Sequence, residues 1–259
     1  MKKLSSTQAL NFYVVIPSRY ASTRLPGKPL LDIGGKPMVV WVAERAHSSG
    51  AHQVVIATDD QRIVDAANEY GFFAVMTNPA HASGTDRIAE VVTQQGWSDD
   101  AIVVNVQGDE PLIEAALIIE VATALANSQE AVMATACHAI NTKVDFLNPN
   151  IVKVALDAQG HALYFSRAPI PYPRDAFAAN EDLPIGIPAY RHIGIYAYRV
   201  KFLKQYANIA PVDIELFESL EQLRVLHHGH KIAVAISENA PSAGVDTVED
   251  LEFVRSLLG

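Results

Sequence analysis

The feature that most constrains this fold is the alternation of short β-branched runs with longer amphipathic segments through the first 130 residues. Strands are expected at 12–16, 53–58, 72–76 and 101–106. Helices are expected between them, at 38–49, 60–70, 85–95 and 114–128. Strands that alternate with helices of about 10–15 residues indicate βαβ units and a largely parallel sheet.

The pattern changes in the second half of the chain. Further strands are expected at 132–138, 151–157, 162–166, 192–198 and 231–236, with helices at 214–227 and 247–257. Residues 167–190 are rich in proline and read as a long loop, which is often functional. We therefore expect one α/β domain over residues 1–259 with a mixed, mostly parallel sheet flanked by helices. Residues 1–11 would be a flexible extension, and a small lobe near 160–212 would supply specificity or a subunit contact.

Composition and charge exclude several classes of protein. The formal net charge of −9 argues against nonspecific nucleic-acid binding. No apolar run approaches the roughly 18 residues of a membrane span, and residues 4–11 are too polar for a signal-peptide core. The single cysteine, Cys137, lies in an apolar run, so we expect a buried thiol and no intrachain disulfide. These features fit a reducing cytoplasm.

A basic loop follows the first expected strand. Arg19, Arg24 and Lys28 lie at its carboxyl end, which is where open α/β sheets bind ligands. Fixed cations beside free backbone amides suit a polyphosphate. The spacing is not that of a Walker A loop, because Pro29 follows Lys28. On charge alone, a solvated basic loop is an equally good interpretation.

Two separate carboxylates are candidates for holding a divalent cation. Asp109 follows the apolar strand 101–106 and is preceded by Gly108, which allows close backbone approach. Mg²⁺ takes one or two carboxylates together with water and substrate phosphates. Asp246 stands just before the last helix. The alternative for both is a carboxylate that caps or enters a helix and faces its dipole.

The segment before the helix at 85–95 is a candidate anion or base-edge site. Ser83, Gly84 and Thr85 present amides and hydroxyls at a helix N-terminus. Arg87 lies in the first turn, where a cation opposes the helix dipole, so a use elsewhere is indicated. An ordinary capped helix remains the alternative.

Polar groups of the second half are less specific. Arg167 and Arg191 could clamp an anionic substrate. His192 alternates with apolar residues in a strand and by itself is more often a core histidine than a catalyst. The histidine tract at 227–230 has no carboxylate or cysteine beside it that would complete a metal site. We interpret it as the exposed C-terminal end of a helix.

Taken together, these segments resemble the CMP-Kdo synthetase family, the 3-deoxy-manno-octulosonate cytidylyltransferases. The matching stretches occur in family order and cover nearly all the chain from Phe12 on. They are IPSRYASTRLPGKPL (16–30), HASGTDR (81–87), VNVQGDEP (104–111), NPNIVKV (148–154), ALYFSRAPIPYPRD (162–175), RHIGIYAY (191–198), SLEQLRVL (219–226) and GVDTVEDLE (244–252).

The resemblance implies a Rossmann-like nucleotidyltransferase fold, a homodimer and a Mg²⁺-dependent transfer of CMP from CTP to Kdo for lipopolysaccharide synthesis. It implies that Arg19 and Lys28 bind the triphosphate and that Asp109 and Asp246 bind Mg²⁺, these four being the catalytic residues. It implies nucleotide contacts from Ser83, Gly84, Arg87 and Gln107. It implies a sugar-acid pocket built from Gln107, Arg167, His192, Tyr196, Glu221 and Gln222.

Alternatives remain open at this point. A sialic acid cytidylyltransferase would use nearly the same chemistry and differ in the pocket of the second half. A catalytically silent nucleotide-binding protein would be expected to lack Asp109 or Asp246, and both are present. The residues do not separate Kdo from an 8-amino analogue, nor do they give the number of Mg²⁺ ions, the order of binding or the extent of loop closure.

Overall fold

A computed structural model describes residues 10–21, 25–81, 83–242 and 244–259. Arg24 and residues 1–9 of the expected extension lie outside the described residues. The strands of the main sheet are β1 (Phe12–Ser18), β4 (Gln53–Thr58), β5 (Phe73–Met76), β6 (Ile102–Asn105), β7 (Ala131–Ala139), β8 (Lys153–Leu156), β9 (Ala162–Ser166), β10 (Tyr190–Arg199) and β11 (Lys231–Ile236). A small hairpin pairs β2 (Asp32–Ile33) with β3 (Lys36–Pro37).

The helices are η1 (Lys28–Leu30), α1 (Met38–Ser48), α2 (Gln61–Glu69), α3 (Gly84–Gln95), α4 (Ala115–Asn127), α5 (Lys143–Leu147), α6 (Arg174–Ala178), α7 (Val200–Tyr206), α8 (Asp213–Glu218), α9 (Gln222–His227) and α10 (Val248–Leu258). They include those expected near 38–49, 60–70, 85–95, 114–128 and 247–257, together with η1, α5, α6 and α7, which the sequence pattern did not predict. None of those seen in the described residues is long and apolar enough to cross a membrane.

The predicted mixed sheet is confirmed. Its strand order is β11-β7-β10-β6-β1-β4-β5, with β8 and β9 attached beside β10. The pairs β1–β4, β1–β6, β4–β5 and β7–β11 are parallel. Strand β10 runs antiparallel between β6 and β7 and joins the two parallel parts. The pairs β8–β10 and β8–β9 are antiparallel as well. The carboxyl ends of β1 and β6 therefore meet at one edge of the sheet.

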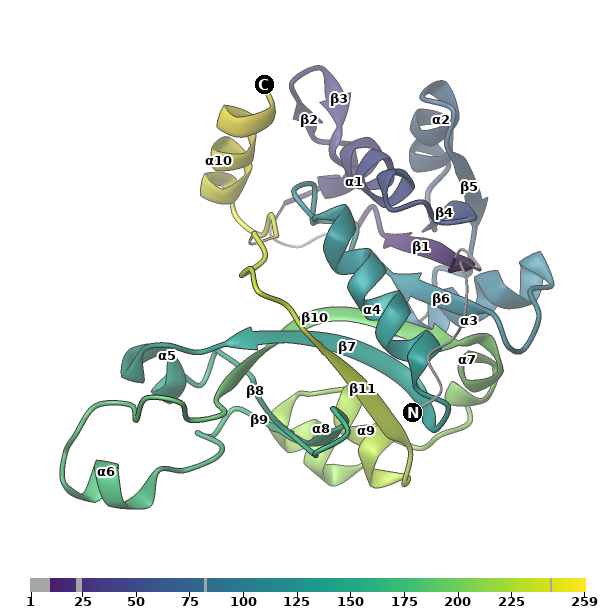
Figure 1. The fold of residues 1–259 in the computed structure, drawn as a ribbon. Helices are drawn as coiled ribbons and strands as arrows, with labels where there is room; N and C mark the ends of the chain where they lie inside the picture. The colour runs from purple at the N-terminus through teal and green to yellow at the C-terminus, as the bar shows by residue number, and fades with distance from the viewer. Residues whose placement is uncertain (1–9, 22–24, 82, 243) are drawn as a thin grey trace.

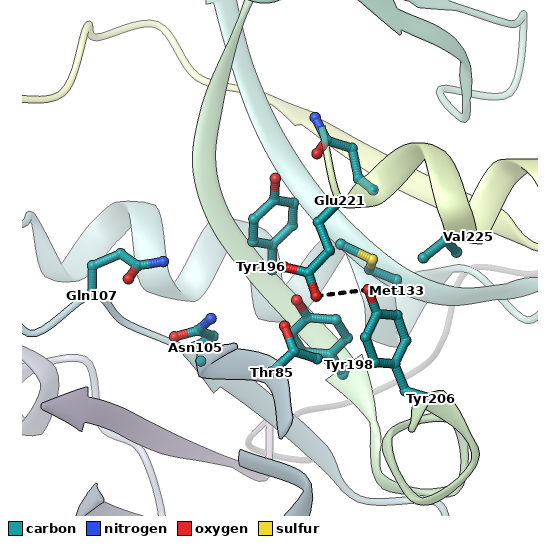
Figure 2. Close-up of a pocket in the computed structure, with 11 residues that line it drawn as sticks. Thr85, Asn105, Gln107, Met133, Tyr196, Tyr198, Tyr206, Glu221 and Val225 are labelled. Carbon is teal, nitrogen blue, oxygen red and sulfur yellow. Dashed lines mark hydrogen bonds between the residues drawn. The ribbon is translucent and has the colours of Figure 1, made fainter. Parts of the chain in front are cut away.

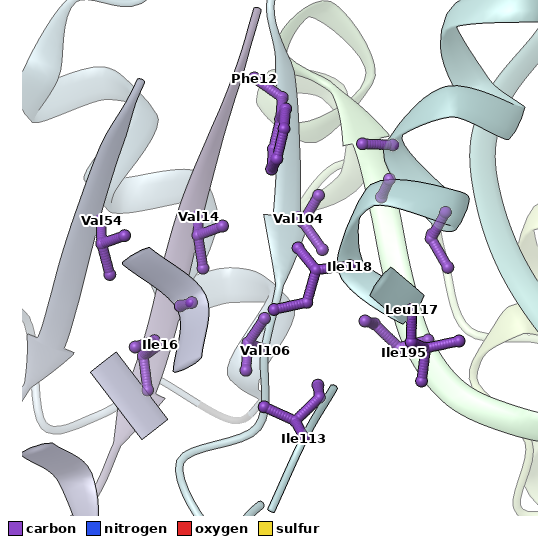
Figure 3. Close-up of a cluster of buried hydrophobic side chains, with 14 of the residues drawn as sticks. Phe12, Val14, Ile16, Val54, Val104, Val106, Ile113, Leu117, Ile118 and Ile195 are labelled. Carbon is purple, nitrogen blue, oxygen red and sulfur yellow. The ribbon is translucent and has the colours of Figure 1, made fainter. Parts of the chain in front are cut away.

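Both faces of the sheet are covered by helices, which explains why its strands are continuously apolar. One face packs Val14, Ile16 and Val104 against α1 and α4 (Figure 3). The other packs Val15 and Val103 against α3, α7 and α9. Cys137 lies in this second layer, and burial raises the pKa of its thiol to about 12, as expected for an inert core cysteine.

Two expectations about local structure are corrected. The helix predicted at 214–227 is two short helices, α8 and α9, because Ser219 adopts a left-handed conformation with φ of 53° and ends the first. The proline-rich stretch also contains the short helix α6. Together with α5 it extends away from the helices that cover the sheet (Figure 1).

Candidate active site

Three segments that are far apart in sequence meet at the ammonium of Lys28. Its Nζ lies 2.8 Å from Oδ2 of Asp109, 3.2 Å from Oδ1 of Asp246 and 2.9 Å from the carbonyl oxygen of Val245. The lysine side chain is 15% exposed, whereas those of Asp109 and Asp246 are 36% and 49% exposed. The two carboxylates singled out in the sequence, Asp109 and Asp246, therefore both contact the ammonium of Lys28 at the edge of the sheet.

Close backbone contacts position Asp109. Gly108 lies against the end of β1, where an added Cβ would stand 2.5 Å from Oγ of Ser18 and 2.9 Å from the carbonyl oxygen of Pro17. Side chains do not tolerate contacts this short, so glycine is required at this position. The carbonyl of Asp109 also accepts a hydrogen bond of 2.8 Å from the amide of Val245. That bond ties the end of β6 to the segment that precedes α10.

A capping box positions Asp246. Thr247 is the N-cap of α10, and its hydroxyl accepts from the amide of Asp250, while the Asp250 carboxylate accepts from the amides of Asp246 and Thr247. These bonds lower the pKa of Asp250 and keep it ionised. The helix start is thereby satisfied by Asp250, which leaves the Asp246 carboxylate turned toward Lys28.

Arg19 lies at the other side of the same loop. One guanidinium nitrogen, Nη2, donates to the carbonyl oxygen of His81 at 2.6 Å. The next amide, of Tyr20, donates to Oδ1 of Asp59. The Tyr20 ring stacks on the guanidinium of Arg62 at 3.5 Å from its centroid. These contacts hold the start of the basic loop against the ends of β4 and the segment before α3.

The start of α3 is a well-formed helix N-terminus. Ser83 is its N-cap and forms a capping box with Asp86. Arg87 is fully buried, and its guanidinium donates to Thr77 and, at 3.1 Å, to Oδ2 of Asp59. Arg87 thus braces the segment that holds Tyr20, and it does not line the cavity beside Gly84. Its predicted contact with a nucleotide stays a prediction.

A cavity of about 100 Å³ opens between α3, β6, β10, α7 and α9 (Figure 2). It brings together Gln107, Tyr196, Glu221 and Gln222 of the predicted sugar-acid set, together with Gly84 of the nucleotide set. Thr85 of the same helix start also lines it. Residues that sequence reasoning missed line it as well; these are Asn105, Met133, Tyr198, Tyr206 and Val225. The sequence does mark Asn105 as unusual, because it is a polar residue within an apolar strand.

Two buried polar atoms in this cavity have no partner among the described residues. They are Oδ1 of Asn105 and Nε2 of Gln222, whose residues are 4% and 3% exposed. Leaving such groups unpaired costs about 1–3 kcal/mol each, so a ligand with hydrogen-bonding groups would be stabilised here. The cavity is therefore built for a polar molecule that supplies both a donor and an acceptor.

The cavity wall carries hydroxyl groups around one carboxylate. Tyr206 donates its hydroxyl to Oε1 of Glu221 at 2.7 Å. Burial, together with the charge of Glu221, raises the pKa of Tyr196, Tyr198 and Tyr206 above the ordinary value. All three hydroxyls consequently stay protonated at neutral pH and serve as hydrogen-bond donors.

Arg167 and His192, the other two residues predicted for the sugar acid, lie outside the lining of this cavity. Arg167 donates from Nε to the carbonyl of Glu218 at 2.7 Å and from Nη1 to that of Pro149 at 3.0 Å. The His192 ring lies 5.5 Å from that of Tyr196, so it adjoins the wall of the cavity.

Comparison with known proteins shows the family of this chain. Residues 13–232 match the family model of the cytidylyltransferases. A solved structure of CMP:2-keto-3-deoxy-manno-octonic acid synthetase in complex with CTP is 42% identical, with a TM-score of 0.85 over 95% of this chain and 98% of that one.

Two more distant structures share the fold. A cytidylyltransferase from Leptospira borgpetersenii is 18% identical, with a TM-score of 0.58 over 96% of this chain and 86% of that one. The 4-diphosphocytidyl-2C-methyl-D-erythritol synthase from Anaerococcus prevotii is 12% identical, with a TM-score of 0.59 over 96% and 99%. This chain therefore belongs to the cytidylyltransferase family, as a relative of the CMP:2-keto-3-deoxy-manno-octonic acid synthetases.

Proposed function

We propose that this enzyme transfers CMP from CTP to the anomeric hydroxyl of Kdo, releasing pyrophosphate and supplying CMP-Kdo for lipopolysaccharide synthesis. The similarity to a CTP-bound synthetase of the same sugar acid supports both substrates. The observation that carries the proposal is the convergence of Asp109 and Asp246 on Lys28 at the carboxyl edge of the sheet. A site of this kind suits a triphosphate and its counter-ion.

The residues fit Mg²⁺ as the cofactor. Asp109 and Asp246 provide hard carboxylate oxygens that already share the charge of Lys28. No group of three or more His, Cys, Asp or Glu side chains gathers as a metal site in the described part of the chain. Two carboxylates suit Mg²⁺, which completes its shell with water and substrate phosphates. When bound, Mg²⁺ would neutralise phosphate charge and lower the pKa of the attacking hydroxyl.

The protein's own part in the reaction is to position CTP and to balance its charge. Lys28, released from its carboxylates, and Arg19 would neutralise the triphosphate. The amides and hydroxyl of Ser83 and Gly84 would hold the nucleotide at the start of α3. Phosphoryl transfer depends mainly on such alignment and charge stabilisation. The anomeric hydroxyl would then attack the α-phosphate in line with the departing pyrophosphate.

The cavity would hold the sugar acid. Its tyrosine hydroxyls and the amide nitrogen of Gln222 are donors, and the carboxylate of Glu221 is an acceptor for sugar hydroxyls. Gln107 lies on the same strand end as Asp109, so it could contact both substrates. Arg167 and His192 would complete the pocket from β9 and β10.

We further propose a cytoplasmic homodimer. Two segments leave large apolar side chains uncovered, with Tyr172 61% and Ile185 105% exposed on either side of α6 and Leu216 65% and Phe217 90% exposed on α8. Exposed apolar surface of this kind marks interaction sites, and a second copy of the chain is the partner proposed here. Its light-scattering mass should be twice that of the 28.1 kDa chain.

Pyrophosphate release tests the function directly. The assay compares CTP with ATP, GTP and UTP, each with and without Kdo and Mg²⁺. Release that needs CTP, Kdo and Mg²⁺ together is expected. Faster release with sialic acid or 8-amino-Kdo would reassign the sugar. Binding of CTP and Mg²⁺ with no turnover on any sugar acid would contradict the proposal.

A further inference from the structure

The strand that carries His192 is interrupted by a bulge. In the pairing of β10 with β7, Ile193 lies opposite Ala136 and Tyr196 lies opposite Thr135. Gly194 and Ile195 therefore have no counterpart on β7. A bulge re-aims the neighbouring side chains and is frequent beside active sites.

The hydroxyl of Thr135 fills this bulge. Thr135 is fully buried, and its Oγ1 lies 3.0 Å from the carbonyl oxygen of Ile193 and 2.8 Å from that of Ile195. The same oxygen lies 2.9 Å from Nε2 of His192. One hydroxyl thus has three close neighbours, of which two are pure acceptors.

The Thr135 hydroxyl has one proton, and the direction in which it points determines which nitrogen of His192 is protonated. Two carbonyl oxygens at these distances would repel Oγ1 unless the hydroxyl proton points to them. The hydroxyl is therefore used as a donor toward the backbone, and its lone pair faces the imidazole. It follows that Nε2 of His192 carries a proton and donates it to Thr135.

The other ring nitrogen is then an acceptor. Burial lowers the pKa of His192 from 6.5 to about 3, so the imidazole is neutral near pH 7. A neutral imidazole with a proton on Nε2 has a bare lone pair on Nδ1. The ring itself is held in place by the edge of Phe165 at 5.0 Å.

The backbone of the bulge leaves open space at Gly194. Gly194 stands between His192 and Tyr196 in β10, and a Cβ placed on it would meet nothing within 4 Å. Tyr196 lines the cavity. Because the His192 ring lies 5.5 Å from that of Tyr196, a substrate in the cavity would reach the imidazole by extending past Tyr196 and over the bulge.

We propose that Thr135 is a positioning residue that fixes the Nε2–H tautomer of His192, so that Nδ1 accepts a hydrogen bond from a sugar hydroxyl. This inference rests on the proposed function for the identity of the ligand. It has a consequence for specificity, because an acceptor nitrogen cannot pair with the carboxylate of the sugar acid. That carboxylate must be bound by donors elsewhere in the pocket. His192 then recognises a hydroxyl group of the sugar.

Nitrogen NMR of the histidine-labelled enzyme tests the tautomer without any turnover. In the wild type, His192 should show a protonated Nε2 and an unprotonated Nδ1 at pH 7. A protonated Nδ1 would overturn the inference. The spectrum of His192→Gln assigns the resonance. A wild type that lacked transferase activity would disprove the proposed function and leave this measurement intact.

Kinetics test the link to the sugar acid. Thr135→Val removes the acceptor for Nε2, and KM for Kdo should rise about tenfold, the worth of one well-placed hydrogen bond, with KM for CTP unchanged. Thr135→Ser restores the hydroxyl and should restore both KM and the nitrogen spectrum. Thr93→Val, which removes an exposed hydroxyl from α3, is the control for general effects of hydroxyl loss.

Two results would contradict the positioning role. One is a Thr135→Val enzyme with an unchanged tautomer and unchanged KM for Kdo. The other is an equal loss for Kdo and CTP in Thr135→Val that Thr135→Ser does not relieve, which would indicate a merely structural role.

Discussion

The two halves of the candidate site, the charged cluster at Lys28 and the cavity, have different electrostatic environments. At the edge of the sheet, Lys28, Asp109 and Asp246 form a partly exposed cluster of full charges. In the cavity, by contrast, protonated tyrosines and uncharged amides surround the one carboxylate of Glu221. Charges near water can exchange one partner for another at modest cost, whereas a buried pocket must satisfy each polar group in place. The charged cluster is thus suited to binding ions that replace one another. The cavity is suited to a ligand of fixed shape.

The largest expected effect comes from breaking the charged half. Asp109→Asn and Asp246→Asn should each lower kcat at least about a hundredfold, a loss near 2.7 kcal/mol, because each removes a metal-binding charge. Thermal unfolding should show both variants folded. CMP-Kdo formation within about tenfold of the wild type would remove that carboxylate from the metal role.

Removing the guanidinium of Arg167 should affect the two substrates differently. Arg167→Ala should raise KM for Kdo by about ten- to a hundredfold, as expected for a charge-assisted hydrogen bond, and change KM for CTP far less. Arg174→Ala, which removes an exposed guanidinium from α6, is the matched control. Equal losses for both substrates would count against a sugar-acid role for Arg167.

A smaller effect is expected from the carboxylate of the cavity. Glu221→Gln keeps the size of the side chain and removes the charge that accepts the Tyr206 hydroxyl. KM for Kdo should rise about tenfold, since a charged acceptor is replaced by a weaker neutral one. Glu130→Gln, at an exposed ion pair with Lys231, is the control. An unchanged KM for Kdo in Glu221→Gln would place the sugar elsewhere.

The environment of His192 predicts an acid sensitivity. Burial lowers the pKa of His192 from 6.5 to about 3, so between these values the unfolded state binds the extra proton. The free energy of unfolding should therefore fall as pH drops below 6.5, by at most about 1.4 kcal/mol per pH unit from this residue. Urea unfolding of the wild type and His192→Gln measures the difference. Parallel pH profiles for the two would contradict a buried neutral imidazole.

The sequence places Asp109 just past a strand and Asp246 just before a helix, and it led us to expect that the two carboxylates meet. They do lie together at the edge of the sheet, whereas their role in metal binding stays a prediction. The pairing of both with Lys28 was not predicted, because three loops had to pack before any distance was set. The break of the predicted 214–227 helix at Ser219 was missed because apolar periodicity continues across it.

The cavity was harder to predict for a physical reason. Its wall comes from β6, β10, α3, α7 and α9, and which faces meet depends on how α7 and α9 cover the sheet. The sequence analysis singled out neither Tyr198 nor Tyr206 as a site residue. For Arg87, the sequence showed an unusual position at a helix start. It did not show the partners of the side chain, Thr77 and Asp59.

A crystal structure with Mn²⁺ in place of Mg²⁺ and a non-hydrolysable CTP analogue tests the central claim most directly. The anomalous signal locates the metal without assumptions about its ligands. We expect a peak about 2.0–2.3 Å from carboxylate oxygens of both Asp109 and Asp246, with Lys28 moved onto the phosphates. A metal bound by neither carboxylate, with Lys28 still between them, would contradict the account.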